Sequence, residues 1–375
     1  MLFRSLLIAR RPHQAFWALV RSVALLACVL MALPAHAQAP LKKVRIAVGT
    51  PVLNVGYPAI MLPLVLDYWK QEGYDVEVLA AGASLQALQQ MVGGNVEFAS
   101  INSSAIIQAN VMNNVPVRAV MNNGVIDWSI SVLEDGPIKS VKDLKGKTVG
   151  VISLATGGVA YYKSFLRANG LDPDKDVQLV SVGLGAAPVD ALRTNKVQGL
   201  LYWAAAQATF ENAGLKLRHL RDPAWRNFPD ISLATTQKLI DSDPSMVEAI
   251  ARGAAKATEF VFANPDCARK LHWSRWPNTK PSGADEATLV KWDMNNQQAQ
   301  IDSMMDAHKM NGGKLIGQAT PEPYARNQDF LFDNKMIDKK VPATTYMVTI
   351  PNFYEIINKF DHAAIRAQAM NCPIK

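Results

Sequence analysis

An alternation of short apolar strands with helices, repeated once along the chain, constrains the fold more than any other feature of this 375-residue sequence. The strands expected in the first copy are 44–48, 76–79, 96–99 and 117–121. Between the second and third of these, a helix begins at Ser84, a suitable N-cap, and ends at the glycines 93–94. The strands expected in the second copy are 148–152, 177–180 and 197–202, with helices at 157–169 and 189–193. Strands that alternate with helices of this length form mostly parallel sheets, so the sequence predicts an α/β fold with two similar lobes.

Two connecting segments and a helical C-terminal region complete the predicted organisation. Residues 123–136 lead out of the first copy, with 129–133 as an extended crossing, and residues 221–234 lead back. The helices expected after this return are 244–263, 284–308, 321–332 and 354–371. A chain that leaves one lobe and returns to it has two hinges, with a cleft between the lobes. We therefore assign 38–123 and 235–375 to lobe 1, 136–221 to lobe 2, and 124–135 and 222–234 to the hinge connectors.

The first 37 residues are typical of an export signal. Four arginines without any acid precede an apolar run at 23–33, and small residues at 35–37 suit cleavage. The apolar run is too short to span a bilayer comfortably. We expect a signal peptide over 1–37, a mature start near Gln38 and a periplasmic protein. A retained membrane anchor and a lipid-modified Cys28 are the alternatives.

The net charge of the chain excludes some classes of binding partner. Without its first 37 residues the chain keeps 35 Lys and Arg against 32 Asp and Glu, a net charge of about +3. A nearly neutral protein does not favour nucleic acid or an anionic membrane as its partner.

Cys267 and Cys372 remain after cleavage. They either pair in an oxidising compartment or stay two unrelated thiols, and their spacing does not decide between these.

The residue types of common catalytic and metal sites are sparse. The histidines that follow residue 37 are His219, His272, His308 and His362, and they are 36 or more residues apart. No nucleotide-binding, nucleophile-elbow or zinc-protease motif occurs. The sequence therefore predicts no metal, no cofactor and no catalytic residue, and it favours a binding protein over an enzyme.

Two stretches carry a resemblance to a known family. Residues 67–77, DYWKQEGYDVE, are similar to a family helix that runs into F-x-x-E-G-L-x-V-E, and residues 141–150, VKDLKGKTVG, are similar to L-K-G-K-x-V-G. Over roughly residues 44–263 the chain resembles the solute-binding proteins of ABC importers in the NMT1/THI5-like and SsuA/TauA-like family. The resemblance implies a type II periplasmic binding protein with two lobes and two hinges. It also implies a monomer that delivers a small solute to a permease and its ATPase and meets the membrane only through that permease.

The ends of the predicted strands supply most candidate ligand-binding residues. In an open α/β sheet, ligands bind outside the carboxyl ends of the strands, where helix N-termini present free N–H groups. The candidates at these ends are Asn54, Tyr57, Asn102, Ser103, Ser104, Thr156, Gly157, Gly158 and Gly185. Hydroxyl and bare N–H groups suit an oxyanion, and the resemblance also supports the loop 156–158. The alternative role for Ser103 and Thr156 is simple N-capping.

Three aromatic residues complete the predicted site. Trp128 lies in the outbound hinge and Trp203 at the end of a strand, and both places face the cleft. Aromatic rings there stack on a ring or an alkyl group of the solute, with core packing as the alternative role. Of the neighbours Tyr161 and Tyr162, only one faces the cleft, and Tyr161 is the better candidate because Tyr162 shares the apolar face of its helix.

These observations predict a receptor for a small anionic organic solute, which we expect to be a sulfonate, a taurine-like compound or an aromatic carboxylate. Nitrate is a further ligand that the resemblance implies. Two other functions remain compatible with the sequence. One is the binding or synthesis of a thiamine-precursor pyrimidine on the same fold, and the other is a ligand-sensing subunit of a signalling receptor.

Overall fold

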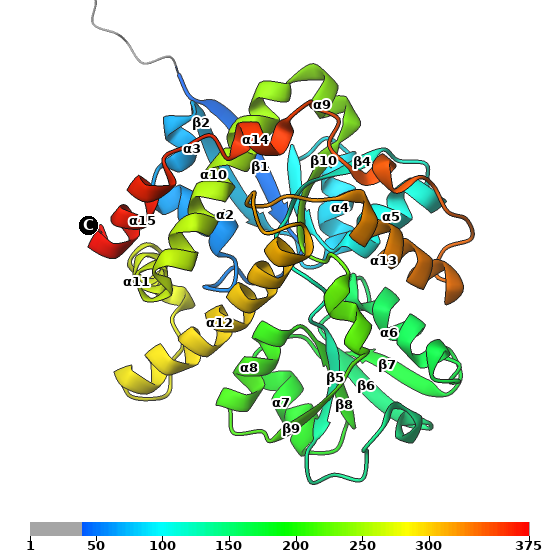
Figure 1. Cartoon of the computed structure of the whole chain (residues 1–375). Coiled ribbons are helices and arrows are strands. Elements are labelled where there is room, and N and C mark those ends of the chain that lie inside the picture. The colour runs from blue at the N-terminus through cyan, green and yellow to red at the C-terminus, as the bar shows by residue number, and fades with distance from the viewer. Residues whose placement is uncertain (1–39, 375) are drawn as a thin grey trace, which may run out of the picture. The chain divides into compact units, whose positions relative to one another are not determined.

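The computed structural model describes residues 40–374 and contains two five-stranded sheets (Figure 1). The predicted signal peptide 1–37, its cleavage site and Cys28 lie outside the described residues. No helix in the described part of the chain combines the length and apolarity needed to cross a bilayer.

The first sheet has the strand order β2-β1-β3-β10-β4. Its strands are β1 (Lys42–Val48), β2 (Tyr74–Ala80), β3 (Phe98–Ile101), β4 (Val117–Asn122) and β10 (Ser232–Thr236). Strand β1 pairs in parallel with β2 and β3, whereas β10 is antiparallel to both of its neighbours. We call this sheet and the helices packed on it lobe 1.

The second sheet repeats this arrangement in the order β7-β6-β8-β5-β9. Its strands are β5 (Ser129–Leu133), β6 (Lys147–Val151), β7 (Val177–Ser181), β8 (Gly199–Tyr202) and β9 (Leu217–Leu220). Strand β6 is parallel to β7 and β8, and β5 is antiparallel to β8 and β9. This sheet with α6, α7 and α8 is lobe 2, so the predicted two-lobed α/β fold is confirmed.

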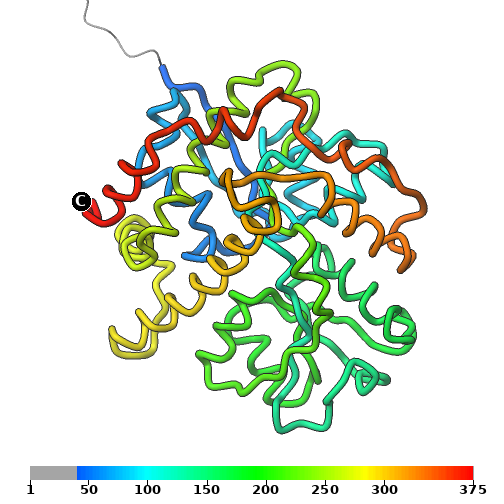
Figure 2. Tube along the Cα trace, in the orientation of Figure 1, coloured from blue at the N-terminus to red at the C-terminus, as the bar shows by residue number. Residues whose placement is uncertain are grey.

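The chain passes between the sheets twice, as Figure 2 shows. The first strand after each crossing, β5 or β10, is the antiparallel strand of the sheet that it enters. Residues 129–133 and 232–234 thus lie in sheets, although the sequence assigned them to the hinge connectors. Backbone pairing across the sheet explains the difference, because a five-residue run cannot reveal its long-range partner. We propose shorter connectors, 123–128 and 221–231.

Helices cover both sheets. In lobe 1 they are α2 (Pro58–Val65), α3 (Tyr68–Gln71), α4 (Ser84–Val92), α5 (Ser103–Met112), α9 (Gln237–Ser242) and α10 (Pro244–Ala263). In lobe 2 they are η1 (Val141–Leu144), α6 (Gly158–Ala168), α7 (Ala186–Arg193) and α8 (Ala204–Asn212), and η2 (Pro223–Asn227) lies in the returning connector. The rest are α11 (Pro265–Arg275), η3 (Pro277–Thr279), α12 (Glu286–Met310), α13 (Pro321–Asp333), η4 (Ala343–Tyr346), α14 (Phe353–Ile357) and α15 (His362–Asn371).

Helix α10 shows why the sequence folds as it does locally. The Asp243 side chain accepts from Met246 N at 3.0 Å, and Pro244 occupies the first turn, where its missing N–H is not needed. The side chains spaced along one face, Val247, Ile250, Ala254, Ala257 and Val261, are all 0% exposed. A capping aspartate, a proline in the first turn and an apolar stripe therefore predict this helix from its local sequence alone.

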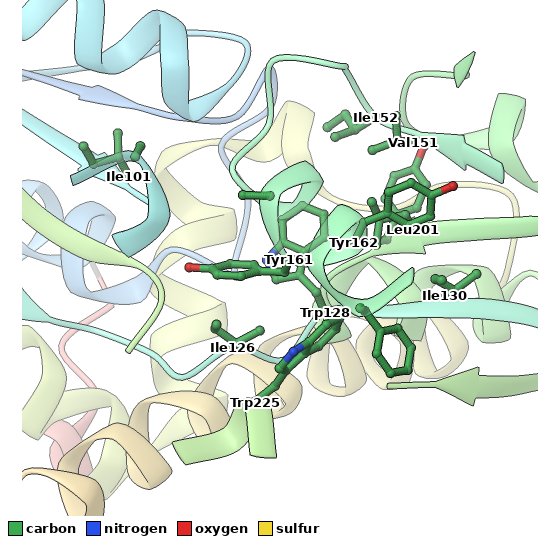
Figure 3. Close-up of a cluster of buried hydrophobic side chains, with 14 of the residues drawn as sticks. Ile101, Ile126, Trp128, Ile130, Val151, Ile152, Tyr161, Tyr162, Leu201 and Trp225 are labelled. Atoms are coloured by element: carbon green, nitrogen blue, oxygen red, sulfur yellow. The ribbon is translucent and has the colours of Figure 1, made fainter. Parts of the chain in front are cut away.

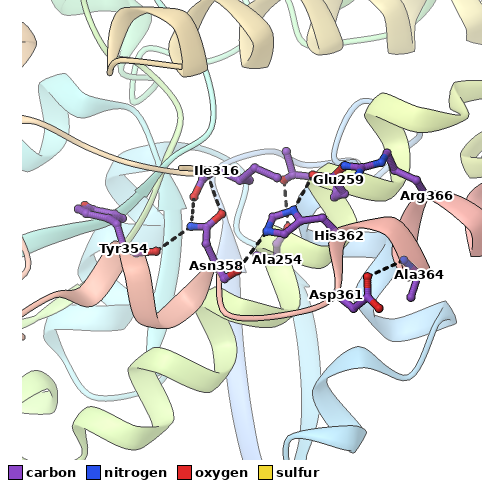
Figure 4. Close-up of polar contacts among 10 residues, drawn as sticks. Ala254, Glu259, Ile316, Tyr354, Asn358, Asp361, His362, Ala364 and Arg366 are labelled. Atoms are coloured by element: carbon purple, nitrogen blue, oxygen red, sulfur yellow. Dashed lines mark hydrogen bonds and ion pairs between the residues drawn. The ribbon is translucent and has the colours of Figure 1, made fainter. Parts of the chain in front are cut away.

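Two local expectations are wrong. Ser84 is not the N-cap of α4, since Ala83 holds that position and the Ser84 hydroxyl donates to Asn102 Oδ1 at 2.5 Å. The helix predicted over 354–371 is two helices, α14 and α15. Asn358 ends the first by bonding both the N–H and the C=O of Ile316, and Asp361 caps the second (Figure 4).

The C-terminal helices are tied to lobe 1 by charge and by a covalent bond. Glu259 on α10 accepts from His362 Nδ1 at 3.0 Å and from Arg366 Nη1 at 2.6 Å (Figure 4). Cys267 and Cys372 form a disulfide that joins α11 to the end of α15. The structure thus decides between the two alternatives that the sequence left open for these cysteines.

A buried apolar cluster runs from lobe 1 into lobe 2 (Figure 3). Ile101 from β3 and Ile126 from the first connector belong to the same cluster as Val151, Tyr161 and Leu201 of lobe 2. The two lobes are therefore in direct contact around the connectors.

Candidate ligand site between the lobes

A small cavity of about 30 Å³ lies where the lobes and connectors meet. Its lining residues are Gly49, Tyr57, Asn102, Val125, Asp127, Trp128, Ile152, Thr156, Trp203, Asp230, Ile231, Gln300 and Ser303. They come from both lobes, from both connectors and from α12. A cavity of this volume holds roughly two water molecules, so an organic solute enters only when the walls move apart.

The structure brings five of the predicted site residues to this cavity. They are Tyr57, Asn102, Trp128, Thr156 and Trp203. The rings of Trp128 and Trp203 are 5.5 Å apart between centroids and tilted by 57°. Trp128 is 3% exposed, whereas Trp203 is only partly buried. The tryptophans therefore form an aromatic wall to which the first connector contributes Trp128 and the end of β8 contributes Trp203.

Two predicted residues lie away from the cavity. Asn54 Oδ1 accepts from Gly56 N at 2.9 Å, so this side chain closes its own turn. Gly185 is exposed at the start of α7 with φ at +76°, a conformation that favours glycine. Neither residue lines the cavity, and each has a local structural role.

Three other predicted residues form a contact between the lobes beside the cavity. The Tyr161 hydroxyl of α6 lies 2.9 Å from Ser103 Oγ and accepts from Ser104 N at 3.1 Å. Ser104 Oγ donates to the Gly157 carbonyl at 3.1 Å. Tyr161, predicted to face the cleft, points toward lobe 1, and its hydroxyl is used by protein partners. The neighbouring Tyr162 is buried, and its hydroxyl has no partner among the described residues.

The predicted anion loop at Thr156, Gly157 and Gly158 needs correction. A Cβ on Gly157 would lie 2.4 Å from Asn102 Cβ, and a Cβ on Gly158 would lie 2.4 Å from the Trp128 ring. These glycines are required because other side chains occupy the adjacent space. Of this loop, only Thr156 lines the cavity between the lobes, whereas Thr156 and Gly157 also line a separate pocket together with Ser84 and Lys163.

Two buried carboxylates in the connectors, Asp127 and Asp230, were missed by sequence reasoning. Asp230 Oδ1 accepts from Asn102 Nδ2 at 2.7 Å, and Asp230 Oδ2 accepts from Trp128 Nε1 at 2.9 Å. Burial raises the pKa of Asp230 to about 8 despite these donors. Burial also raises the pKa of Asp127 to about 6, and the positive charge of Arg226 partly opposes this shift. The only available signal was an acid with apolar neighbours, Asp127 between Ile126 and Trp128 and Asp230 between Pro229 and Ile231.

Helix α12 contributes Gln300 and Ser303, which the sequence did not place in the site. Ser303 Oγ donates to Val125 O and accepts from Val125 N, both at 3.1 Å. Gln300 Nε2 donates to Asn123 O at 3.3 Å. The same helix packs on α8 of lobe 2, where Asn296 Nδ2 donates to Ala205 O (Figure 1). A polar stripe at helical spacing was the signal that this face of α12 is buried against polar backbone.

The cavity lining offers neutral hydrogen-bonding groups and two acidic side chains. It contains no Cys, His, Lys or Arg among its described residues. No group of three or more His, Cys, Asp or Glu suitable for a metal ion occurs within residues 40–374. An oxyanion placed here would meet two acidic side chains, Asp127 and Asp230, and no cation, which conflicts with the expectation of a hydroxyl-lined anion site.

Comparisons with known proteins place this geometry in a family. The model of the family described as NMT1/THI5 like matches residues 59–268, more than half of the chain. A search of curated protein sequences gave no match.

Solved structures with the same fold include two binding proteins and an enzyme. The periplasmic aliphatic sulphonate binding protein SsuA from Escherichia coli is 16% identical, with a TM-score of 0.54 over 82% of this chain and 92% of that one. The alkanesulfonate-binding protein SsuA from Xanthomonas axonopodis pv. citri, bound to MOPS, is 13% identical, with a TM-score of 0.60 over 82% and 99%. The desulfurization enzyme DszB, in complex with biphenyl-2-sulfinic acid, is 17% identical, with a TM-score of 0.55 over 85% and 99%.

At these identities the structural likeness shows the fold alone, whereas the family match covers the sequence itself. The chain belongs to the NMT1/THI5-like family and has the two-lobed fold of periplasmic solute-binding proteins.

Proposed function

We propose that this protein is the extracytoplasmic solute receptor of an ABC importer, which closes its two lobes around a small molecule and delivers it to the permease. The observation that carries the proposal is the cavity lined by both lobes, both connectors and α12. Since the lining is divided among parts joined by only two connectors, hinge bending opens and closes it. The arrangement suits capture and release better than a permanent structural role.

The remaining partners and the location follow from this proposal. The protein is exported with cleavage of residues 1–37, works in the periplasm as a monomer and meets the membrane through the permease and its ATPase. The SsuA structures, named as sulfonate-binding proteins, favour a sulfonate as the solute. The two carboxylates in the lining disfavour any anion, and this conflict decides which probes an experiment must include.

An enzymatic function is the second candidate, because the DszB structures share the fold. The lining supplies Tyr57, Thr156 and Ser303 as hydroxyl groups but no His or Cys to activate a nucleophile. Binding without turnover is therefore the better-supported reading of this site.

A thermal-shift screen tests the proposal. It covers sulfonates, aromatic carboxylates, nitrate, pyrimidines and organic amines, each with wild type, Trp203→Ala and Trp276→Ala. Trp276 is a partly buried tryptophan that stacks on His272 away from the cavity, so it is a matched control. We expect at least one solute to stabilise wild type and Trp276→Ala but not Trp203→Ala, and to be recovered unchanged by mass spectrometry. No Trp203-dependent stabilisation would overturn the receptor assignment, and a modified solute would establish the enzyme instead.

A further inference from the structure

The ionisable side chains that line the cavity are both acids. Asp127 and Asp230 both line it and are 4% and 1% exposed, while the other lining side chains are neutral. Within the described residues, no Lys, Arg or His lies within ion-pair distance of either carboxylate. Arg226 is the cation that acts on Asp127, but its Nε donates to Asp306 Oδ2 at 2.9 Å. Buried carboxylates are usually paired with a cation, so a counter-charge fits this site.

The two carboxylates differ in how much of their hydrogen-bonding capacity is used. Asp230 accepts from Asn102 and Trp128 and lies 3.5 Å from the Tyr161 hydroxyl, so it organises the walls. Asp127 has the Ser303 hydroxyl and the backbone N–H of Ala204 nearby. The Ser303 proton is already donated to Val125 O. Asp127 is therefore the carboxylate with more capacity left for a donor from outside the protein.

The apolar part of the lining also suits a cation. Trp128 and Trp203 present their rings to the same cavity as Asp127, and Tyr57 adds a third aromatic ring. The face of an indole ring attracts a positive charge within about 6 Å of its centroid, most strongly where water is excluded. An anion gains nothing from these faces.

A second small cavity indicates where the rest of a solute extends. It shares Tyr57, Ile231 and Gln300 with the first cavity and also touches Asn123. Asn123 is 6% exposed, and its Nδ2 has no hydrogen-bond partner among the described residues. A buried amide donor without a partner fits an acceptor atom on a ligand.

We propose, on the basis of the solute-receptor function above, that this site binds an organic cation. The solute is a protonated amine or an amidinium on a flat apolar body, with its charge at Asp127 and its body against Trp128 and Trp203. Asp230 fixes Trp128 in this aromatic wall by accepting a hydrogen bond from Trp128 Nε1.

The pH dependence of binding gives the sign of the ligand charge. Asp127 is faced by Arg226 and Tyr57, and Asp230 is faced by Asp127, Tyr161 and Tyr324. Burial raises the pKa of both carboxyls, to about 6 and about 8. A bound cation favours their ionised forms and releases protons, so its affinity rises with pH. An anion favours the protonated forms, and its affinity falls with pH.

The experiment uses three probes of nearly the same shape: benzamidinium, benzamide and benzoate. Their affinities for the mature protein are measured by calorimetry and by chemical shifts of the tryptophan indole N–H groups, at pH 6, 7 and 8. The variant is Asp127→Asn. The matched control is Asp293→Asn, because Asp293 is also a buried acid, 8% exposed, that accepts from Trp273 outside the cavity.

We expect benzamidinium to bind at least about tenfold more tightly than benzamide or benzoate, since placing like charges together is strongly unfavourable. Its affinity rises from pH 6 to pH 8, falls at least about tenfold in Asp127→Asn and is unchanged in Asp293→Asn. Tighter binding of benzoate, or an affinity that falls with pH, would overturn the cation assignment while leaving the receptor function intact. If none of the probes binds but a sulfonate passes the thermal-shift screen, the cation assignment is again overturned. If nothing binds in either experiment, both proposals fail.

Discussion

The loops that follow the parallel strands and the segments that cross between the lobes both approach the cavity, but they do different things there. The strand-end loops supply Asn102, Ser103, Ser104 and Gly157, which mostly contact each other across the lobes. The crossing segments supply Asp127, Trp128 and Asp230, which give the cavity its charge and its largest aromatic surface. Trp203, at the end of β8, is the exception among the strand ends.

This difference indicates which segments of the chain would contact a solute between the lobes. Loops at strand ends that face one another must fit closely when the lobes meet, and small residues and hydroxyl groups allow this fit. A connector is present in the site whether the lobes are apart or together, because both lobes are attached to it. Under the receptor function proposed above, groups on the connectors meet the solute first, and the strand-end loops close behind it.

The largest expected effect tests the strand-end loops as a contact between lobes. In Gly157→Val the new Cβ would lie 2.4 Å from Asn102, so the lobes are held apart. We expect the affinity for a solute found in the screen to fall about 100-fold, equivalent to roughly 2.7 kcal/mol. Small-angle scattering should show no ligand-induced compaction of the variant.

The control for this change is Gly136→Val, in a lobe 2 turn where a Cβ meets only Leu133. This variant should bind normally. Full affinity of Gly157→Val would show that the loop at 156–158 does not approach Asn102 in the ligand complex, and the comparison between loops and connectors would fail.

The next effect separates the two tryptophans. Trp203→Ala should weaken binding by about 1–3 kcal/mol with a modest change in stability, because its ring is only partly buried. Trp128→Ala should weaken binding and also destabilise the fold by about 3–5 kcal/mol, since this ring is buried and donates to Asp230. Calorimetry and urea unfolding measure the two quantities. Equal stability losses in the two variants would contradict the division between a connector residue and a strand-end residue.

A smaller effect on binding is expected from Tyr161→Phe. The variant loses the hydroxyl that meets Ser103 and Ser104, so the free energy of unfolding should fall by about 1–3 kcal/mol. The affinity for the solute should change less than about threefold, as protein groups use this hydroxyl. A large loss of affinity at unchanged stability would instead place Tyr161 in contact with the solute.

A further expected effect, on stability and not on affinity, is a dependence of the free energy of unfolding on pH that comes from Asp230. Its carboxyl titrates near 3.8 when unfolded and at about 8 in the folded protein. Between these values the folded state holds one more proton, so the free energy of unfolding falls as pH rises. The free energy of unfolding is measured with urea at pH 5, 6, 7 and 8. In Asp230→Asn it should fall less steeply with pH than in wild type, by the contribution of about one proton. Identical slopes for wild type and variant would show that Asp230 is ionised throughout and already paired.

Much of the fold was predictable because its signals are local. The stripe on α10, the glycine ends of α4 and α6 and the strand–helix alternation each depend on residues within one or two turns. The positions of Trp128 and Trp203 in the cavity followed from the same alternation. The acids were not predictable in this way, since a lone Asp between apolar residues has the same local pattern in a surface loop.

The sequence by itself determined most of the elements, their repeat and the family, because periodicity, capping and turn residues act over short distances. Only the tertiary structure decided the pairing of Cys267 with Cys372 and the hydrogen bonds of Ser103 and Ser104 to the Tyr161 hydroxyl. It also decided that Asp127 and Asp230 are buried in the same cavity as Trp128 and Trp203. These depend on which distant segments pack together. The start of a helix depends on neighbouring residues in the sequence. The free energy of ionising a carboxyl group depends instead on how much water and which charges the folded chain leaves around it.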